Sequence, residues 1–316
     1  MNQTSRRAFI KNTSLFAGFI PFMGFSLNDW SMANGNDELS VHIFSKHLQF
    51  LDYKAAGQVA AELGFSGLDL TVRPKGHVLP ERVKEDLPKA IKEIQLGGST
   101  CNVMTTAIES VSNPLDVEVL QIASDVGIKY YRTNWFKYKE ELTLAESLDF
   151  YKEEVKKIGE LNKKLGLVGC YQNHAGTKVG ASYWEIYKLL ESVNPNYFGA
   201  QYDIRHALIE GGLSWENGVK LLQSSIKTIV LKDFKWVNIN GKWKVQNVPI
   251  GKGMVDFDSY FKLLKKYNLN PPVTLHLEYD LGGAEKGKST INVDKKVVFE
   301  AMKQDLTNVQ KIWKNA

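Results

Sequence analysis

Alternation between short β-rich runs and amphipathic helical segments constrains the fold of this chain more than any other feature. The β-rich runs recur at intervals of roughly thirty residues, the length of one βα unit, at residues 41–44, 67–70, 100–104, 130–134, 167–171, 198–202, 228–231 and 273–277. Segments with helical periodicity follow them, at residues 53–63, 81–94, 115–124, 144–165, 183–192, 215–222, 257–267 and 295–313. Alternation of this kind predicts a parallel sheet with crossover helices. Because there are eight units, we predict an α/β protein that forms a single (β/α)8 TIM barrel over residues 36–316.

One βα unit is longer than the others and contains a turn signal. Residues 236–245 alternate about the pair Asn240-Gly241, and Asn-Gly favours the positive φ values that a two-residue hairpin turn requires. We predict a β-hairpin insertion between strands 7 and 8 of the barrel, over the C-terminal ends of the strands. It acts there either as a partial lid or as simple decoration.

The first thirty residues have the pattern of an export signal. Arg6 and Arg7 are followed by Phe9 and Lys11, and a short apolar run occupies residues 15–25. This order is typical of a twin-arginine signal and predicts export to the periplasm. The run is shorter than the about 20 apolar residues that a spanning helix needs, so we expect no integral membrane segment after leader removal. An uncleaved anchor or a terminal helix is the alternative interpretation.

Charge and cysteine content exclude some classes of function. The formal net charge of the 316 residues is +5, but acidic residues are interspersed with the basic ones. Because a nucleic-acid surface usually needs clustered Lys and Arg, we expect no nucleic-acid partner. The cysteines, Cys101 and Cys170, lie in apolar strand-like runs without a CxxC motif, so buried free thiols are favoured over a disulfide or a metal pair.

Polar side chains gather where the predicted strands end. Functional side chains project from these C-terminal ends in barrels of this class. Each such residue alone has a structural explanation, but unpaired buried charges cost several kcal/mol unless a partner, metal or polar ligand compensates them. We therefore predict a site for a small carbohydrate among Lys46, His47, Asp69, Arg73, His77, Arg132, Asn134, Trp135, Gln172, Asn173, His174, Asp203, Arg205, His206, Lys232, Asp233, His276, Glu278 and Tyr279.

Several short motifs, in this order along the chain, resemble one family, the xylose-isomerase-like sugar phosphate isomerases and epimerases. They are the twin-arginine leader, Phe44-Ser45-Lys46-His47-Leu48, Asn173-His174, Tyr202-Asp203 with His206, Leu231-Lys232-Asp233, Pro249-Ile250-Gly251-Lys252-Gly253 and Leu277-Glu278-Tyr279. The resemblance implies a TIM barrel, commonly with one divalent metal, Mn²⁺, Mg²⁺, Co²⁺ or Zn²⁺. Members isomerise or epimerise ketoses, and some dehydrate keto-inositols. Such barrels often pair, so a homodimer is also expected.

The family's metal ligands are only partly matched. The resemblance implies a Glu, an Asp, a His and a Glu on strands five to eight, and Asp203 and Glu278 match two of these positions. Gln172 replaces the first Glu, and Val230 replaces the His. Asp203, Glu278 and His174 could still form an open three-ligand site, because divalent ions accept carboxylate and imidazole ligands.

The mechanism that the resemblance implies is proton abstraction beside a carbonyl. Glu278 is the candidate base, because Gln172 removes the second acid-base group of the family. His206 could hold a substrate oxygen or transfer a proton, and Lys232 could stabilise an enediolate where a metal is lacking. The candidate substrate-binding residues are Lys46, Arg132, Trp135, Gln172, His206 and His276.

These observations favour an exported sugar isomerase or epimerase acting on a ketose or keto-sugar. A keto-sugar lyase or dehydratase is a close alternative, since elimination begins with the same proton removal. A carbohydrate-binding barrel without turnover is a second alternative, which the missing Glu and His favour. A metal-dependent nuclease on the same fold is disfavoured, because the third strand ends in Val103-Met104-Thr105 and supplies no ligand.

Overall fold

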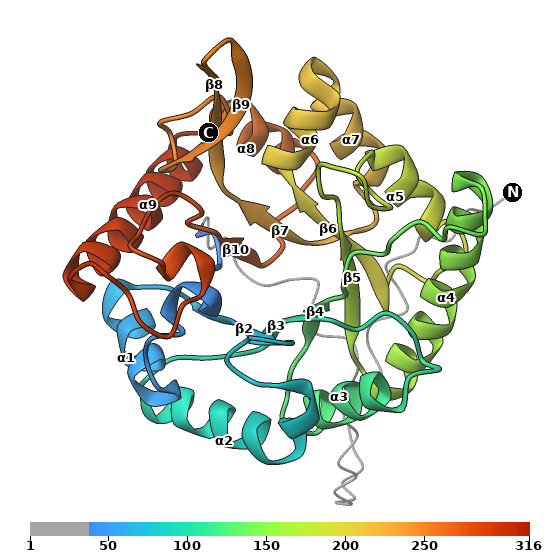
Figure 1. The fold of residues 1–316 in the computed structure, drawn as a ribbon, viewed down its shortest axis with the longest axis horizontal. Helices are drawn as coiled ribbons and strands as arrows, with labels where there is room; N and C mark the ends of the chain where they lie inside the picture. Colours follow the sequence, from blue (N-terminus) through green and yellow to red (C-terminus); the bar gives the residue numbers. More distant parts are fainter. Residues whose placement is uncertain (1–37) are drawn as a thin grey trace, which may run out of the picture. The chain divides into compact units, whose positions relative to one another are not determined.

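Eight parallel strands close into a barrel in the computed structural model, which describes residues 38–316 (Figure 1). The leader predicted at residues 1–30 lies outside the described residues. Each strand pairs with its neighbour along the chain, and the last pairs with the first. The barrel strands are β1 (Val41–Phe44), β2 (Gly67–Val72), β3 (Val103–Thr106), β4 (Tyr130–Arg132), β5 (Val168–Gln172), β6 (Phe198–Asp203), β7 (Ile226–Leu231) and β10 (Val273–Leu275). The predicted (β/α)8 TIM barrel is confirmed.

Helices surround the barrel and cover the outer face of its strands (Figure 1). They are α1 (Tyr53–Leu63), α2 (Val83–Leu96), α3 (Pro114–Asp125), α4 (Leu144–Leu165), α5 (Tyr183–Leu190), α6 (Ile204–Gly211), α7 (Trp215–Leu222), α8 (Phe257–Lys266) and α9 (Lys295–Asn315). Short 3₁₀ segments follow at η1 (Ser45–Leu48), η2 (Pro80–Arg82), η3 (Gly212–Ser214) and η4 (Ala284–Lys286). No helix in this described part of the chain is long and apolar enough to cross a membrane.

Helices with strong local end signals have the predicted bounds. Helix α4 begins after Thr143, whose side chain accepts the N–H of Glu146 while Glu146 accepts the N–H of Thr143. The helix ends at Gly166, which has a φ of 70° that other residues rarely adopt. This reciprocal cap and the glycine stop explain why the sequence located both ends of α4.

Several predicted boundaries differ from the structure by one to three residues, and one helix was not predicted. The third strand begins at Val103 rather than residue 100, because its pairing with β2 starts at Asp69↔Val103. Helix α6 was not predicted, since it is short and directly follows β6. Asp203, the last residue of β6, caps α6 by accepting the N–H of His206 at 3.1 Å.

The predicted hairpin is confirmed. It consists of β8 (Asp233–Ile239) and β9 (Lys242–Val248), which pair antiparallel after β7. Asn240 and Gly241 form its turn with φ values of 53° and 79°. The hairpin is the orange strand pair at the outer edge of Figure 1.

Strand alternation decides which side chains enter the barrel. On β4, Tyr131 points outward and its hydroxyl donates to Asn162 of α4, so the neighbouring Arg132 points inward. On β6, Tyr202 packs outward against Tyr260 of α8, so Asp203 points inward. The same alternation directs polar residues from several strands to one end of the barrel interior.

Candidate active site

Four side chains form a connected group at the C-terminal end of the barrel, here called the rim cluster: Asp203, His206, Lys232 and Glu278. Lys232 lies at its centre. Its Nζ is 2.8 Å from His206 Nε2, 3.1 Å from Asp203 Oδ2 and 3.6 Å from Glu278 Oε2. The cluster joins residues that follow three separate strands, so the predicted convergence of these catalytic candidates is observed in the geometry.

Asp203 is fully buried, and donors contact both of its carboxylate oxygens. Its Oδ2 accepts the Gln172 side-chain amide at 2.8 Å and lies 3.1 Å from Lys232 Nζ, while its Oδ1 accepts the N–H of His206. Burial raises the pKa of Asp203, and the positive charges of Lys232 and Arg205 oppose that effect. With these partners the carboxylate anchors Lys232 and is hydrogen-bonded through both of its oxygens inside the protein.

Glu278 is the accessible carboxylate of the rim cluster, with 24% of its side-chain surface exposed against 0% for Asp203. Burial of its carboxyl group opposes ionisation, but Lys232, the His276 side chain and Lys46 together hold its pKa well below the usual range. Glu278 is therefore ionised at neutral pH. An ionised and partly exposed carboxylate can accept a proton from a bound molecule.

His206 is buried and uncharged. Burial lowers its pKa well below the usual value, and the charge of Lys232 adds to that effect. Its Nδ1 accepts the backbone N–H of Ala175 at 3.1 Å, which leaves Nε2 as the ring nitrogen that faces Lys232 and Asp203. The ring is thus fixed with one nitrogen directed into the rim cluster.

The predicted metal ligands do not form a metal site. Within residues 38–316, no three His, Cys, Asp or Glu side chains are grouped so that they could hold a metal ion. Lys232 stands between Asp203 and Glu278, and a cation cannot share that position with an ammonium group. His174 is turned aside, with its Nδ1 3.0 Å from the Ala175 carbonyl and its ring 4.3 Å from Trp135. Asp203 and Glu278 therefore belong to a lysine-centred cluster and His174 lies beside Trp135, an arrangement that does not fit the predicted three-ligand metal site.

The predicted substrate-binding residues flank the rim cluster on two sides. On one side the Arg132 guanidinium lies 4.1 Å from the Trp135 ring centroid, and Trp135 packs against His174. On the other side Lys46 Nζ is 3.9 Å from Glu278 Oε1, and His276 Nδ1 is 3.5 Å from the same oxygen. Lys46 and His276 thus adjoin the candidate base Glu278.

Several polar atoms beside this cluster have no hydrogen-bond partner among residues 38–316, and Arg205 Nε and His276 Nδ1 are among them. Trp135 Nε1 and Gln172 Oε1 are buried and have no hydrogen bond within the part of the chain that the structure describes. Because buried polar atoms are nearly always satisfied in native proteins, unsatisfied ones at one place indicate hydrogen bonds to a ligand or water.

Sequence reasoning missed a contact between the hairpin and the rim cluster. Asn247 of β9 accepts a hydrogen bond from Arg205 at 2.6 Å, and its own amide donates to the Glu278 carbonyl at 3.2 Å. The hairpin therefore fixes the backbone beside the candidate base. The hairpin signal was visible in the sequence, but nothing in it indicated which residue would reach the barrel.

Other strand-end residues have structural roles. Asp233 accepts the backbone N–H groups of Phe234, Gly251, Gly253 and Val255, so it organises the loop after β9. His47 accepts the N–H of Leu277 and contacts the Ala284 carbonyl. These side chains support the site without facing a substrate.

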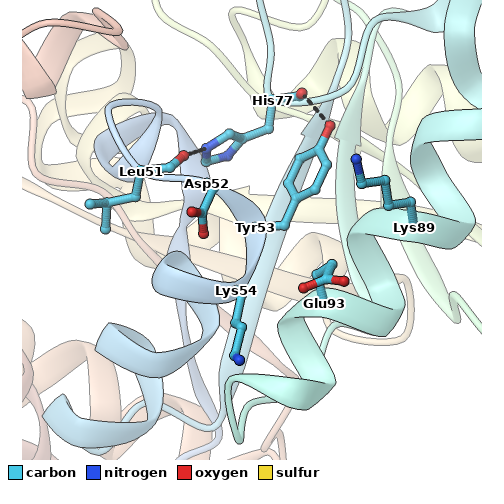
Figure 2. A pocket seen from close by; sticks show the side chains of 7 residues that line it. All are labelled: Leu51, Asp52, Tyr53, Lys54, His77, Lys89 and Glu93. Carbon is cyan, nitrogen blue, oxygen red and sulfur yellow. Dashed lines mark hydrogen bonds between the residues drawn. The ribbon is translucent and has the colours of Figure 1, made fainter.

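His77 lies outside the barrel, away from the rim cluster. It lines an outer pocket of about 580 Å³ between α1 and α2, together with Leu51, Asp52, Tyr53, Lys54, Lys89 and Glu93. Figure 2 shows its ring directed to the Leu51 carbonyl, 3.4 Å away, while the Tyr53 hydroxyl donates to the His77 carbonyl. His77 holds the loop after β2 against α1.

Burial of His77 makes the free energy of unfolding depend on pH. Burial lowers its pKa from 6.5 to about 4, so the unfolded chain binds a proton between these values and the folded chain does not. Stability from this group is complete above pH 6.5 and is lost as the pH falls toward 4. We expect the free energy of unfolding of the wild type, relative to H77Q, to fall by up to ~1.4 kcal/mol per pH unit in this window. Urea unfolding at pH 7, 6, 5 and 4.5 measures it, and a constant difference would contradict the burial of a neutral ring.

Comparison with known proteins places the chain in a family. The family described as xylose isomerase-like TIM barrel matches residues 58–293, most of the chain, so this protein belongs to that family. No curated protein sequence matches it.

Solved structures with the same fold include enzymes of two reaction types. The probable 3-DHS dehydratase AsbF from Bacillus anthracis superposes with a TM-score of 0.62 at 15% identity, covering 85% of this chain and 99% of that one. The 3-keto-D-glucoside 4-epimerase YcjR from E. coli gives 0.61 at 11% identity, covering 85% and 100%. A xylose isomerase-like TIM barrel protein from Mycobacterium smegmatis in complex with magnesium gives 0.62 at 10% identity, covering 87% and 98%. At these identities the likeness shows the fold.

Proposed function

We propose that this protein is a sugar isomerase or epimerase that removes a proton beside the carbonyl of a ketose or keto-sugar. The observation that supports this proposal is the rim cluster. It combines an ionised, partly exposed carboxylate on Glu278 with the buried amino group of Lys232, 3.6 Å from its Oε2. A base and an adjacent cation are the groups that proton abstraction next to a carbonyl needs.

The reaction begins when Glu278 accepts the proton from the carbon beside the carbonyl. The electron pair of the broken C–H bond forms a C=C bond, and the carbonyl oxygen gains negative charge. Lys232 stabilises that oxygen, and His206 Nε2 exchanges a proton with it. Glu278 then returns the proton to the former carbonyl carbon. At the same time the hydroxyl on the first carbon gives its proton to His206 Nε2 and becomes the new carbonyl, which completes an isomerisation.

Gln172 influences which outcome follows. An amide cannot serve as a second acid-base group on the opposite face of the substrate. Inversion at one carbon by two opposed bases is therefore disfavoured, and proton return on one face is favoured. Elimination of a β-hydroxyl as water from the same intermediate is the second candidate function. It needs only one base, and the similar fold of a dehydratase makes it worth testing.

Incubation in D₂O with ketoses and keto-glycosides tests the proposal. Deuterium at one carbon, with formation of an isomer, supports isomerisation, and loss of water supports the lyase alternative. Binding of sugar without any exchange would overturn both and favour the carbohydrate-binding barrel without turnover.

The rim cluster does not suit a metal ion, because the Lys232 amino group already lies between the carboxylates of Asp203 and Glu278. We therefore expect exhaustive dialysis against EDTA to leave the exchange rate within about twofold of the untreated enzyme, a change of less than ~0.5 kcal/mol in activation free energy. Rates before and after dialysis, with added Mn²⁺, Mg²⁺, Co²⁺ or Zn²⁺, measure this. A large loss that one of these ions restores would contradict it.

Export through the twin-arginine pathway is a separate proposal, supported by Arg6 and Arg7 ahead of the apolar run at residues 15–25. We expect the double variant R6K/R7K to accumulate in the cytoplasm, whereas the wild type appears in the periplasmic fraction. Immunoblots of cell fractions measure the distribution. An unchanged distribution would show that the leader has another role.

A further inference from the structure

Cations outnumber carboxylates around the rim cluster. The cationic side chains are Lys46, Arg73, Arg132, Arg205 and Lys232, and the carboxylates that they face are Asp69, Asp203 and Glu278. The nearby histidines do not alter this balance, because burial lowers the pKa of His174 to about 4 and that of His276 to about 3. The site thus has an excess of positive charge at neutral pH.

Arg73 and Arg132 account for the excess. Neither guanidinium has a carboxylate within 4.0 Å among residues 38–316. Asp69 is the carboxylate whose charge acts on both arginines. Its oxygens, however, accept the hydroxyls of Thr105 and Thr274 at 2.9–3.1 Å inside the barrel. Asp69 is thereby satisfied without pairing to either arginine.

The guanidinium of Arg132 is buried with most of its donors unused. Its one hydrogen bond within the described part of the chain runs from Nη1 to the Thr133 carbonyl, at 2.9 Å. Burial lowers its pKa to about 9, and the neighbouring charge of Arg73 acts in the same direction. A guanidinium has five N–H donors, so Arg132 keeps donors available for a ligand.

Arg73 and Lys46 lie close to one aromatic ring. The Arg73 guanidinium is 5.4 Å and Lys46 Nζ is 5.7 Å from the centroid of Phe44. Lys46 is also 3.9 Å from Glu278 Oε1, so these cations adjoin the candidate base. Glu285 is the other acid near Lys46, but it already accepts the backbone N–H groups of Leu281 and Gly283 and lies 3.6 Å from Lys286 Nζ.

Concentrated like charge in a buried place is costly unless an anion compensates it. Arginine binds carboxylate and phosphate oxygens through two parallel hydrogen bonds, and this geometry suits the unpaired guanidinium groups. A neutral sugar would leave both of them without a counter-charge.

We propose that the rim site takes an anionic substrate, a ketose or keto-sugar with a carboxylate or phosphate group that Arg73, Arg132 and Lys46 bind. The reaction at its carbonyl rests on the proposed function above, but the binding of the anionic group does not. The proposal narrows the substrate class from ketoses and keto-sugars in general to those with an anionic group.

Calorimetric titration of the full chain in 150 mM NaCl tests the proposal. The carboxylate probe is 5-keto-D-gluconate, the phosphate probe is D-fructose 6-phosphate, and D-fructose is the neutral counterpart of both. We expect one anionic probe to bind at least about tenfold more tightly than D-fructose, ~1.4 kcal/mol. The probe that binds more tightly shows whether the anionic group of the substrate is a carboxylate or a phosphate. Equal affinity, or no binding of either anionic probe, overturns the proposal.

Arginine variants show whether the proposed residues cause the preference. We expect R73Q and R132Q to lower the ratio of the affinity for the preferred anionic probe to the affinity for D-fructose about tenfold, ~1.4 kcal/mol. R82Q is the matched control, because Arg82 is exposed at η2 and pairs with Asp86. Wild-type affinity in R73Q overturns the proposal, and so does an equal loss in R82Q. Circular dichroism checks that both variants fold. If R132Q does not fold, the affinity of R73Q, whose arginine is less buried, is the test of the proposal.

The same titration separates this inference from the proposed function. Preferential binding of an anionic probe without deuterium exchange would overturn the proposed reaction and leave the substrate class standing. Exchange with neutral ketoses, without an anionic preference, would support the reaction and overturn the substrate class.

Discussion

The E278Q variant is expected to lose proton exchange between substrate and solvent, with a rate about 10²–10⁴-fold below that of the wild type. Glu278 is the one acidic side chain of the rim cluster that is both ionised and partly exposed. The amide keeps the shape of the side chain but cannot accept the proton. Mass spectrometry of deuterium incorporation measures the rate, and titration calorimetry checks that substrate still binds.

An exposed glutamate provides the control for E278Q. Glu300 lies on the surface of α9, and E300Q is expected to exchange protons at the wild-type rate. Wild-type exchange in E278Q would remove Glu278 from the chemistry and require another base. Loss of binding together with loss of exchange would instead indicate that Glu278 holds the substrate.

Replacing Lys232 with methionine is expected to have the second large effect, on both activity and stability. The change removes the cation that lies 3.1 Å from Asp203 and 3.6 Å from Glu278, which leaves Asp203 as a buried, unpaired charge. Breaking a buried pair in this way costs about 3–5 kcal/mol of unfolding free energy. Loss of stabilisation of the developing oxyanion lowers the exchange rate about 10²–10³-fold.

Two further variants distinguish the roles of Lys232. K232M/D203N removes both charges, so urea unfolding should show recovery of much of the lost stability while exchange stays low. K262M, at an exposed lysine of α8, should match the wild type in both measurements. Because Lys232 lowers the pKa of Glu278, residual activity of K232M should lose its base at a higher pH than the wild type does. Wild-type rate and stability in K232M would contradict the central role of this lysine.

The sequence located the strands and helices with strong local signals. Helix α4 has a reciprocal cap at Thr143 and Glu146 and a glycine stop, and the hairpin has Asn240-Gly241 in its turn. Such signals act between residues that are close along the chain, so a single sequence is sufficient to find them. Helix α6 escaped prediction because its cap, Asp203, also ends a strand and was interpreted as a ligand.

The candidate site was predicted as a set of residues, with roles for Glu278, His206 and Lys232, but the contacts between these residues were not predicted. Period-two alternation and the common direction of parallel strands placed Asp203, Lys232 and Glu278 at one end of the barrel. His77 was assigned to the same end, yet the loop after β2 turns it outward to α1. The position of His77 in the sequence does not show in which direction this loop turns.

The sequence by itself determined the barrel, the hairpin and the end of the barrel at which polar side chains gather, because these follow from local periodicity and turn chemistry. Only the tertiary structure decided that Lys232 lies between Asp203 and Glu278, and that Arg73 and Arg132 have no carboxylate within 4.0 Å among residues 38–316. The physical reason is that these contacts join side chains from different strands. Their distances depend on how the closed barrel staggers its strands and on the rotamers that packing allows.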